Sequence, residues 1–188
     1  MSVVNLRRRF EVVDWTQTSV CEVAVTAGNS DGLKSLLEQG EKISEVPAGS
    51  TEYAVYDSRG TLLQRAIDAP ENEDVLKVLL DYGADPSEHF LNVFHYVEDM
   101  VPLQLAVRKR RIATARMLLA GRAKIDEPVK ADSPFPQLHE AARQGVGKMV
   151  HLLIDSDSTQ IRSETNEGWL PIHEAAASGN IECVAIFL

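Results

Sequence analysis

Cysteine, aromatic residues and long apolar runs are all scarce in this chain of 188 residues. Its two cysteines, Cys21 and Cys183, stand far apart, and no CxxC pair suggests a zinc site or a redox dithiol. We expect both to be buried thiols, because a free cysteine packs as a small apolar residue. No apolar run approaches the roughly 18 residues that a membrane-spanning helix requires. With no signal-peptide pattern and no Asn-x-Ser/Thr sequon, we expect a soluble protein of the cytoplasm or nucleus.

Basic charge is also in short supply, since the formal net charge is -9. This balance argues against a nucleic-acid partner, whose phosphates are contacted mainly by lysine and arginine. Motifs of hydrolases, nucleotide-binding loops and kinases are absent from the sequence. The pairs His139-Glu140 and His173-Glu174 begin like a zinc HExxH motif, but Arg143 and Ala177 stand where the second histidine belongs. We therefore expect no catalytic activity, no metal and no cofactor.

What the chain does contain is an internal repeat. Segment 135–145 reads FPQLHEAARQG, and segment 169–179 reads WLPIHEAAASG. The histidines of the two segments lie 34 positions apart. Both segments resemble the ankyrin repeat consensus GxTPLHxAAxxG. The resemblance implies an all-α solenoid of stacked helix-turn-helix units with β-turn fingers.

Five copies can be aligned on the leucine position of this motif, which holds Cys21, Leu63, Leu103, Leu138 and Ile172. The steps between them are 42, 40, 35 and 34 residues, so the first two exceed the ankyrin period of about 33. We expect the surplus in loops near 45–57 and 86–99, which contain turn-forming residues. The predicted organisation is an N-terminal cap segment, 1–18, followed by about five repeats over 19–188, the last one incomplete.

Within each copy, small residues mark a first helix and an apolar stripe marks a second. The alanines Ala24, Ala66, Ala106, Ala141 and Ala175 allow close helix approach. Glycines follow the first helix in repeats one, four and five, but Pro70 and Arg110 take that position in repeats two and three. Gln64 and Gln104 replace the motif histidine there. In this family the histidine bonds a neighbouring turn, so we expect His139 and His173 to be structural.

Partner-binding residues are expected on the fingers and on the exposed side of the first helices, where the resemblance places them. Met100, Phe135 and Trp169 occupy the same position before three successive motifs, so we expect a row of large side chains along the fingers. Beside them, Arg108, Lys109 and Arg143 form a basic groove suited to a protein or peptide with acidic and apolar residues. Two alternatives are that Phe135 and Trp169 pack against neighbouring turns, and that the charges form a solvated rim.

Function is therefore expected to be non-catalytic protein binding. One alternative is the substrate-recognition part of a ubiquitin ligase, and another is an N-terminal regulatory domain of a larger enzyme or channel. A methyl-lysine reader, using Phe135 and Trp169 with Glu167, is a further alternative. The sequence stops within the second helix of repeat five without a polar capping repeat, so we also consider self-association through Phe187 and Leu188.

Overall fold

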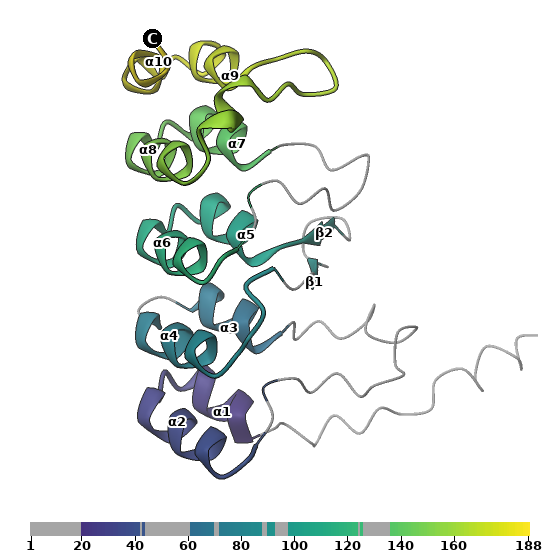
Figure 1. Ribbon diagram of the computed structural model, residues 1–188, viewed down its shortest axis with the longest axis vertical. Coiled ribbons are helices and arrows are strands. Elements are labelled where there is room, and N and C mark those ends of the chain that lie inside the picture. The colour runs from purple at the N-terminus through teal and green to yellow at the C-terminus, as the bar shows by residue number, and fades with distance from the viewer. Residues whose placement is uncertain are drawn as a thin grey trace, which may run out of the picture.

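A computed structural model describes residues 20–41, 43, 61–69, 72–87, 90–92, 98–123, 125 and 136–188 of the chain. These residues form a stack of helix pairs, with the first helices in one column and the second helices in another (Figure 1). The first helices are α1 (Val20–Thr26), α3 (Leu62–Asp68), α5 (Pro102–Arg108), α7 (Gln137–Gln144) and α9 (Pro171–Ala177). The second helices are α2 (Ser30–Glu38), α4 (Glu73–Asp81), α6 (Ile112–Ala120), α8 (Gly147–Ser156) and α10 (Ile181–Phe187). A short 3-10 helix, η5 (Ser158–Arg162), follows α8. The predicted repeat solenoid is confirmed.

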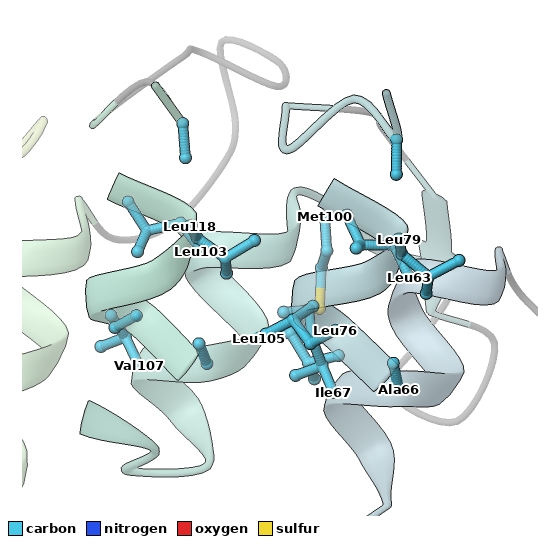
Figure 2. Packing of buried hydrophobic residues seen from close by; sticks show 14 of the residues in the cluster. Leu63, Ala66, Ile67, Leu76, Leu79, Met100, Leu103, Leu105, Val107 and Leu118 are labelled. Carbon is cyan, nitrogen blue, oxygen red and sulfur yellow. The ribbon is translucent and has the colours of Figure 1, made fainter. Parts of the chain in front are cut away.

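The predicted repeat alignment holds at the level of single residues. Each aligned position is the second residue of a first helix, and from Cys21 to Leu138 it is buried. The alanine three positions later is buried in all five repeats, which lets neighbouring helices approach closely. Figure 2 shows the repetition directly, because Leu63 lies beside Leu79 in one repeat as Leu103 lies beside Leu118 in the next. One apolar core therefore runs the length of the stack.

Both cysteines lie within this core, as the sequence predicted. The side chains of Cys21 on α1 and Cys183 on α10 are fully buried. Burial raises the pKa of the Cys183 thiol, with Glu182 adding to the effect. A raised pKa keeps the reactive thiolate scarce, which suits a packing role.

The connection after repeat two contains more structure than expected. Strands β1 (Phe90–Asn92) and β2 (Glu98–Met100) pair antiparallel, with Phe90 opposite Met100 and Asn92 opposite Glu98. The expected loop near 86–99 thus includes a hydrogen-bonded ladder that leads directly into α5. The expected cap, 1–18, and the loop near 45–57 lie outside the described residues.

Most turns use the left-handed backbone that glycine adopts at low cost. Gly145, between α7 and α8, has φ of 71°, and Arg110 occupies the same position of repeat three with φ of 57°. A second arginine, Arg122 after α6, has φ of 68° where repeats one and two have glycine. Repeat three therefore places L-residues in two positions that favour glycine.

Neighbouring repeats are joined by side chains that precede the second helices, a feature missed in the sequence. The amide nitrogen of Asn72 donates to the Val25 carbonyl at 3.0 Å, one repeat back. In repeat five, Asn180 donates to the carbonyls of Ala142 at 3.1 Å and Arg143 at 3.0 Å. We call these bonds the inter-repeat latches. The sequence feature that could have revealed these bonds is an asparagine at the same position of repeats one, two and five.

Candidate functional site

The finger before α9, the strands β1 and β2 and the first helices lie on the same side of the stack (Figure 1). Of the residues predicted for partner binding, Arg108, Lys109 and Arg143 lie on or directly after these first helices, and Trp169 lies on the finger before α9. The first helices α5, α7 and α9 present their last turns to solvent, where Lys109, Arg143 and Ala177 are exposed. Arg108 is half-buried.

The basic residues after α5, which were expected to line a groove, form bonds to the neighbouring repeat. Lys109 Nζ lies 2.8 Å from Asp68 Oδ1, which connects repeat three to repeat two. Arg111 donates to the carbonyls of Asp68, at 3.1 Å, and Ala69. The acidic residue of repeat two therefore balances part of the positive charge of repeat three.

Arg143 is held by its own helix. Its guanidinium contacts the Glu140 carboxylate at 2.7 Å and 3.1 Å in a forked arrangement. Gln144 accepts a bond from Arg110 Nε at 3.2 Å and donates to the Arg108 carbonyl at 3.3 Å. Gln144 thus connects repeat four to Arg108 and Arg110 at the end of the first helix of repeat three.

The finger before α9 is a compact turn closed by its own backbone. Thr165 N–H donates to the Trp169 carbonyl at 2.9 Å, and Gly168 N–H donates to the Thr165 carbonyl at 2.8 Å. Gly168 has φ of 77°, which a glycine tolerates. Trp169 follows at the end of this turn and retains 40% of its accessible surface. The turn therefore presents a large aromatic side chain to solvent.

Two histidines attach this finger to the helices. His139 on α7 is fully buried, and its Nε2 lies 3.0 Å from the Ser163 carbonyl at the start of the finger. His173 Nδ1 accepts a bond from Leu170 N–H at 2.9 Å, and its ring meets the Trp169 ring edge-on at 6.3 Å. Burial lowers the pKa of His139, the bond to Ser163 opposes this, and His173 adds to the lowering. The two histidines bond neighbouring backbone, as expected of structural residues.

Glu174 is a glutamate near Arg143 whose burial the sequence did not indicate. It lies on α9 with only 8% of its surface accessible. Burial raises the pKa of its carboxyl, Arg143 lowers it, and Glu140 and Glu167 raise it. A glutamate directly after the motif histidine has the pattern of an ordinary exposed helix residue. Its burial could therefore not be predicted from the sequence.

The predicted row of finger residues is only partly realised. Met100 is fully buried, so the expectation that it is exposed was wrong. Met100 is the last residue of β2, two positions before the start of α5. Its side chain points inward toward Leu105 and Leu76 (Figure 2). Phe135 lies outside the described residues, which leaves Trp169 as the described exposed member of the row.

Among the residues that the structure describes, no group of three or more histidine, cysteine, aspartate or glutamate side chains could hold a metal ion. None of the described helices combines the length and apolar character needed to cross a membrane.

Comparison with known proteins defines the class of this fold. Residues 103–188 match the family model of ankyrin repeats, in three copies. The ankyrin repeat domain of human ASB11, seen in a crystal structure, is similar with a TM-score of 0.66 and 23% identity, over 90% of this chain and 68% of that one. Residues 103–188 of the chain are thus similar to ankyrin repeats, and the described fold is that of an ankyrin repeat domain. Ankyrin repeats are generally non-catalytic modules of protein–protein interaction.

Two curated proteins are similar in sequence. The human "Transient receptor potential cation channel subfamily A member 1" is 28% identical over 152 residues, which is 81% of this chain and 13% of the channel. The "Tyrosine-protein kinase HTK16" of Hydra vulgaris is 45% identical over 40 residues, 21% of this chain and 5% of the kinase. The chain therefore spans a small fraction of the length of either relative.

Proposed function

We propose that this chain binds a protein partner across its fingers and first helices from α5 to α9, without catalysing a reaction. The observation that carries the proposal is Trp169, an exposed aromatic residue on a finger that is fixed by its own hydrogen bonds and by His173. A large side chain on a rigid support is typical of a binding hot spot, because little conformational entropy is lost when a partner covers it.

The charges near α5 suggest which partner chemistry fits that end of the surface. Arg108, Lys109 and Arg110 lie together in the last turn of α5 and the residues that follow, and Asp68 is the acidic group bonded to Lys109. Acidic side chains of a partner would be attracted to this end, while Arg143 and Trp169 lie further along the stack. An extended segment with acidic and apolar residues would fit such a surface.

A regulatory role within a larger protein is the second candidate. It is supported by the two curated relatives, a cation channel and a tyrosine kinase, in which the similar part is 13% and 5% of the length. In that setting the partner surface would contact another part of the same protein. Self-association through Phe187 and Leu188 stays a separate prediction; Leu188 is exposed after α10, whereas Phe187 is half-buried against the core.

The test is capture of partners from a cell lysate by the wild-type chain and by Trp169→Ala, with identification by mass spectrometry. Tyr82→Ala is a matched control, because Tyr82 is also an exposed aromatic residue but follows a second helix, α4. Circular dichroism must show equal helix content in all three proteins. We expect a specific set of partners to be lost in Trp169→Ala and kept in Tyr82→Ala. Identical partner sets in all three would show that the surface is elsewhere.

A further inference from the structure

Each end of the stack exposes a helix position that is buried in all of the other four repeats (Figure 1). Val20, the first residue of α1, retains 52% of its accessible surface, whereas the first residues of the later first helices are buried, namely Leu62, Pro102, Gln137 and Pro171. Ala176, the sixth residue of α9, is exposed, whereas the sixth residues of the other first helices are buried, namely Val25, Ile67, Val107 and Ala142. The first position therefore faces the preceding repeat, and the sixth position faces the following repeat.

Both exposed ends are apolar. Val23 on α1 is 56% exposed, whereas Leu105 at the same position of α5 is 4% exposed. At the other end, Ile181 and Leu188 retain 83% and 94% of their accessible surface, at the start of α10 and directly after it. Exposed apolar side chains at positions that are buried elsewhere in the same stack indicate a surface that another repeat would cover.

The end at repeat one also carries the donor half of an inter-repeat latch. Asn29 stands at the position of Asn180, with φ of -88° and ψ of 84° against -87° and 77°. Asn180 donates to two carbonyls of repeat four. In the described part of the chain the Asn29 amide nitrogen reaches no carbonyl of another repeat, and the side-chain oxygen accepts a bond from Gly32 N–H at 2.8 Å. Asn29 thus combines the backbone conformation of a latch residue with an amide donor that no other described repeat uses.

The end at repeat five carries the acceptor half. Gly179 and Gly145 both have φ of 71°, but an added Cβ collides with Asn180 at Gly145 and meets nothing within 4 Å at Gly179. The Ala142 carbonyl, which accepts the latch, also accepts a bond from Gly145 N–H at 3.1 Å. The Ala176 carbonyl accepts a bond from Gly179 N–H at the same distance. A carbonyl oxygen has two lone pairs, so Ala176 offers the acceptor that Ala142 offers in repeat four.

We propose that two copies of this chain associate head to tail, with repeat one of one copy stacked on repeat five of the other. Asn29 of the first copy donates to the carbonyls at the end of α9 of the second, and Val20 and Val23 cover the exposed side of that helix. A second copy is the partner because the chain carries both halves of the latch, one at each end. Such a contact is heterologous, so each dimer keeps one free end of each kind and extends into longer assemblies at high concentration. The proposal does not depend on the partner surface proposed above.

The second helices make this contact weaker than the contacts between repeats within the chain. Ser35 on α2 stands where the later second helices have apolar residues, namely Val78, Met117, Leu152 and Ile186. Two separate copies also lose translational and rotational freedom when they bind. We therefore expect association that depends on concentration.

Sedimentation velocity of the whole chain, from about 1 to 300 µM, tests the proposal with one variant for each end. Val23→Glu places a charge on the repeat-one end, and Ile181→Glu places a charge on the repeat-five end. Both residues are exposed, so circular dichroism should show unchanged helix content. We expect the wild type to form dimers and larger species as its concentration rises, and each variant alone to stay monomeric. An equimolar mixture of the two variants should form a dimer that grows no further, because each variant retains one competent end.

A conservative variant tests the latch within the contact. Asn29→Asp keeps the oxygen that accepts a bond from Gly32 N–H but removes the amide donor, and should raise the Kd of association about tenfold or more. Asn166→Asp, at an exposed residue of the finger before α9, makes the same charge change and should leave the Kd unchanged. A monomeric wild type, a monomeric mixture of the two glutamate variants, or full association of Val23→Glu alone would overturn the proposal. So would an unchanged Kd in Asn29→Asp.

Discussion

Two arginines of repeat three, Arg110 and Arg122, have backbone conformations that are unfavourable for any residue with a Cβ atom. Arg110 and Arg122 have φ of 57° and 68°, in the left-handed region where an L-residue is strained. In repeat three the glycine stands one position earlier, at Gly121, so Arg122 receives the left-handed conformation that Gly83 has in repeat two. Arg122 is exposed, which leaves backbone strain as the main local contribution to its effect on stability.

Replacing Arg122 with glycine should stabilise the fold by about 0.5–1 kcal/mol, since relief of strain exceeds the extra chain entropy of glycine. The reverse change, Gly83→Ala, should destabilise it by about 1 kcal/mol, because φ of Gly83 is 92°. Urea denaturation of both variants measures the two effects. If Arg122→Gly instead lowers the free energy of unfolding, the arginine side chain makes a net favourable contribution to stability.

Gly145 and Gly179 offer a matched pair for the latch, because both have φ of 71° after a first helix. An added Cβ meets nothing within 4 Å at Gly179, whereas at Gly145 it collides with the Asn180 side chain. Gly145→Ala should therefore cost about 1–3 kcal/mol more than Gly179→Ala, the usual cost of overpacking. Denaturation midpoints of the two variants give the difference. Equal losses would show that Asn180 moves aside freely.

The residues that sequence reasoning placed wrongly or missed share a physical cause. Met100 shares a motif position with Trp169, but the β1–β2 ladder delivers it to the core, and motif spacing carries no information on ladder register. Glu174 looks like any helix-surface glutamate, and its burial depends on the packing of α9 against α7. Arg108, Lys109 and Arg143 were predicted from the motif positions, but their bonds to Asp68, Gln144 and Glu140 depend on side-chain and backbone geometry that the sequence does not contain.

At the scale of elements, helices were predictable because the alanine and leucine positions recur with a fixed spacing inside each copy. The paired strands were not predictable, because segment 86–99 contains turn-forming residues at its start and little alternation of apolar and polar residues.

The position of the finger of repeat five depends on the bond from His139 to Ser163. The Nδ1 atom of His139 is buried without a hydrogen-bond partner in the described structure. Protonation would place both an unpartnered N–H and a charge in the core.

This gives a pH dependence with a defined sign. Because the pKa of His139 is lowered from 6.5 in the folded chain, the unfolded chain binds more protons below that pH, and stability is lost as pH falls. Between about pH 7.5 and 5.5, the wild type should lose about 1 kcal/mol more than His139→Gln, by linkage. Glutamine is the residue of repeats two and three at this position.

Urea denaturation at both pH values measures the effect. The exposed His151 on α8 provides the control, because His151→Gln removes a surface imidazole and should keep the wild-type pH dependence. If His139→Gln and the wild type lose the same stability on acidification, the source of any pH dependence lies in other groups.

At the scale of the whole molecule, each repeat contacts its neighbours in the stack, so stability is nearly a sum of repeat and interface contributions. The Asn72 latch is one such interface contribution, since it joins repeat two to the end of α1. Asn72→Ala removes one of the two hydrogen bonds that the Val25 carbonyl accepts, the other coming from Gly28 N–H at 3.1 Å, and should cost about 1 kcal/mol.

Hydrogen exchange resolved by segment would show where that cost falls. We expect faster exchange in α1 and α2 of Asn72→Ala, with little change from α7 to α10, because coupling passes from neighbour to neighbour. A uniform increase along the whole stack would instead indicate that the chain unfolds as a single cooperative unit.

The glycine and asparagine of each latch also constrain the order in which substitutions can accumulate. Gly28 faces Asn72, and Gly145 faces Asn180, whereas Arg110 is followed one repeat later by Val146. Introducing the asparagine opposite a residue that has a Cβ creates a collision, whereas introducing the glycine first relieves backbone strain and removes only the exposed bond from Arg110 to Gln144. If evolution introduced a latch between repeats three and four, glycine at position 110 would therefore be acquired before asparagine at position 146. The effect of either mutation depends on whether the other is already present, which is epistasis with a defined structural origin.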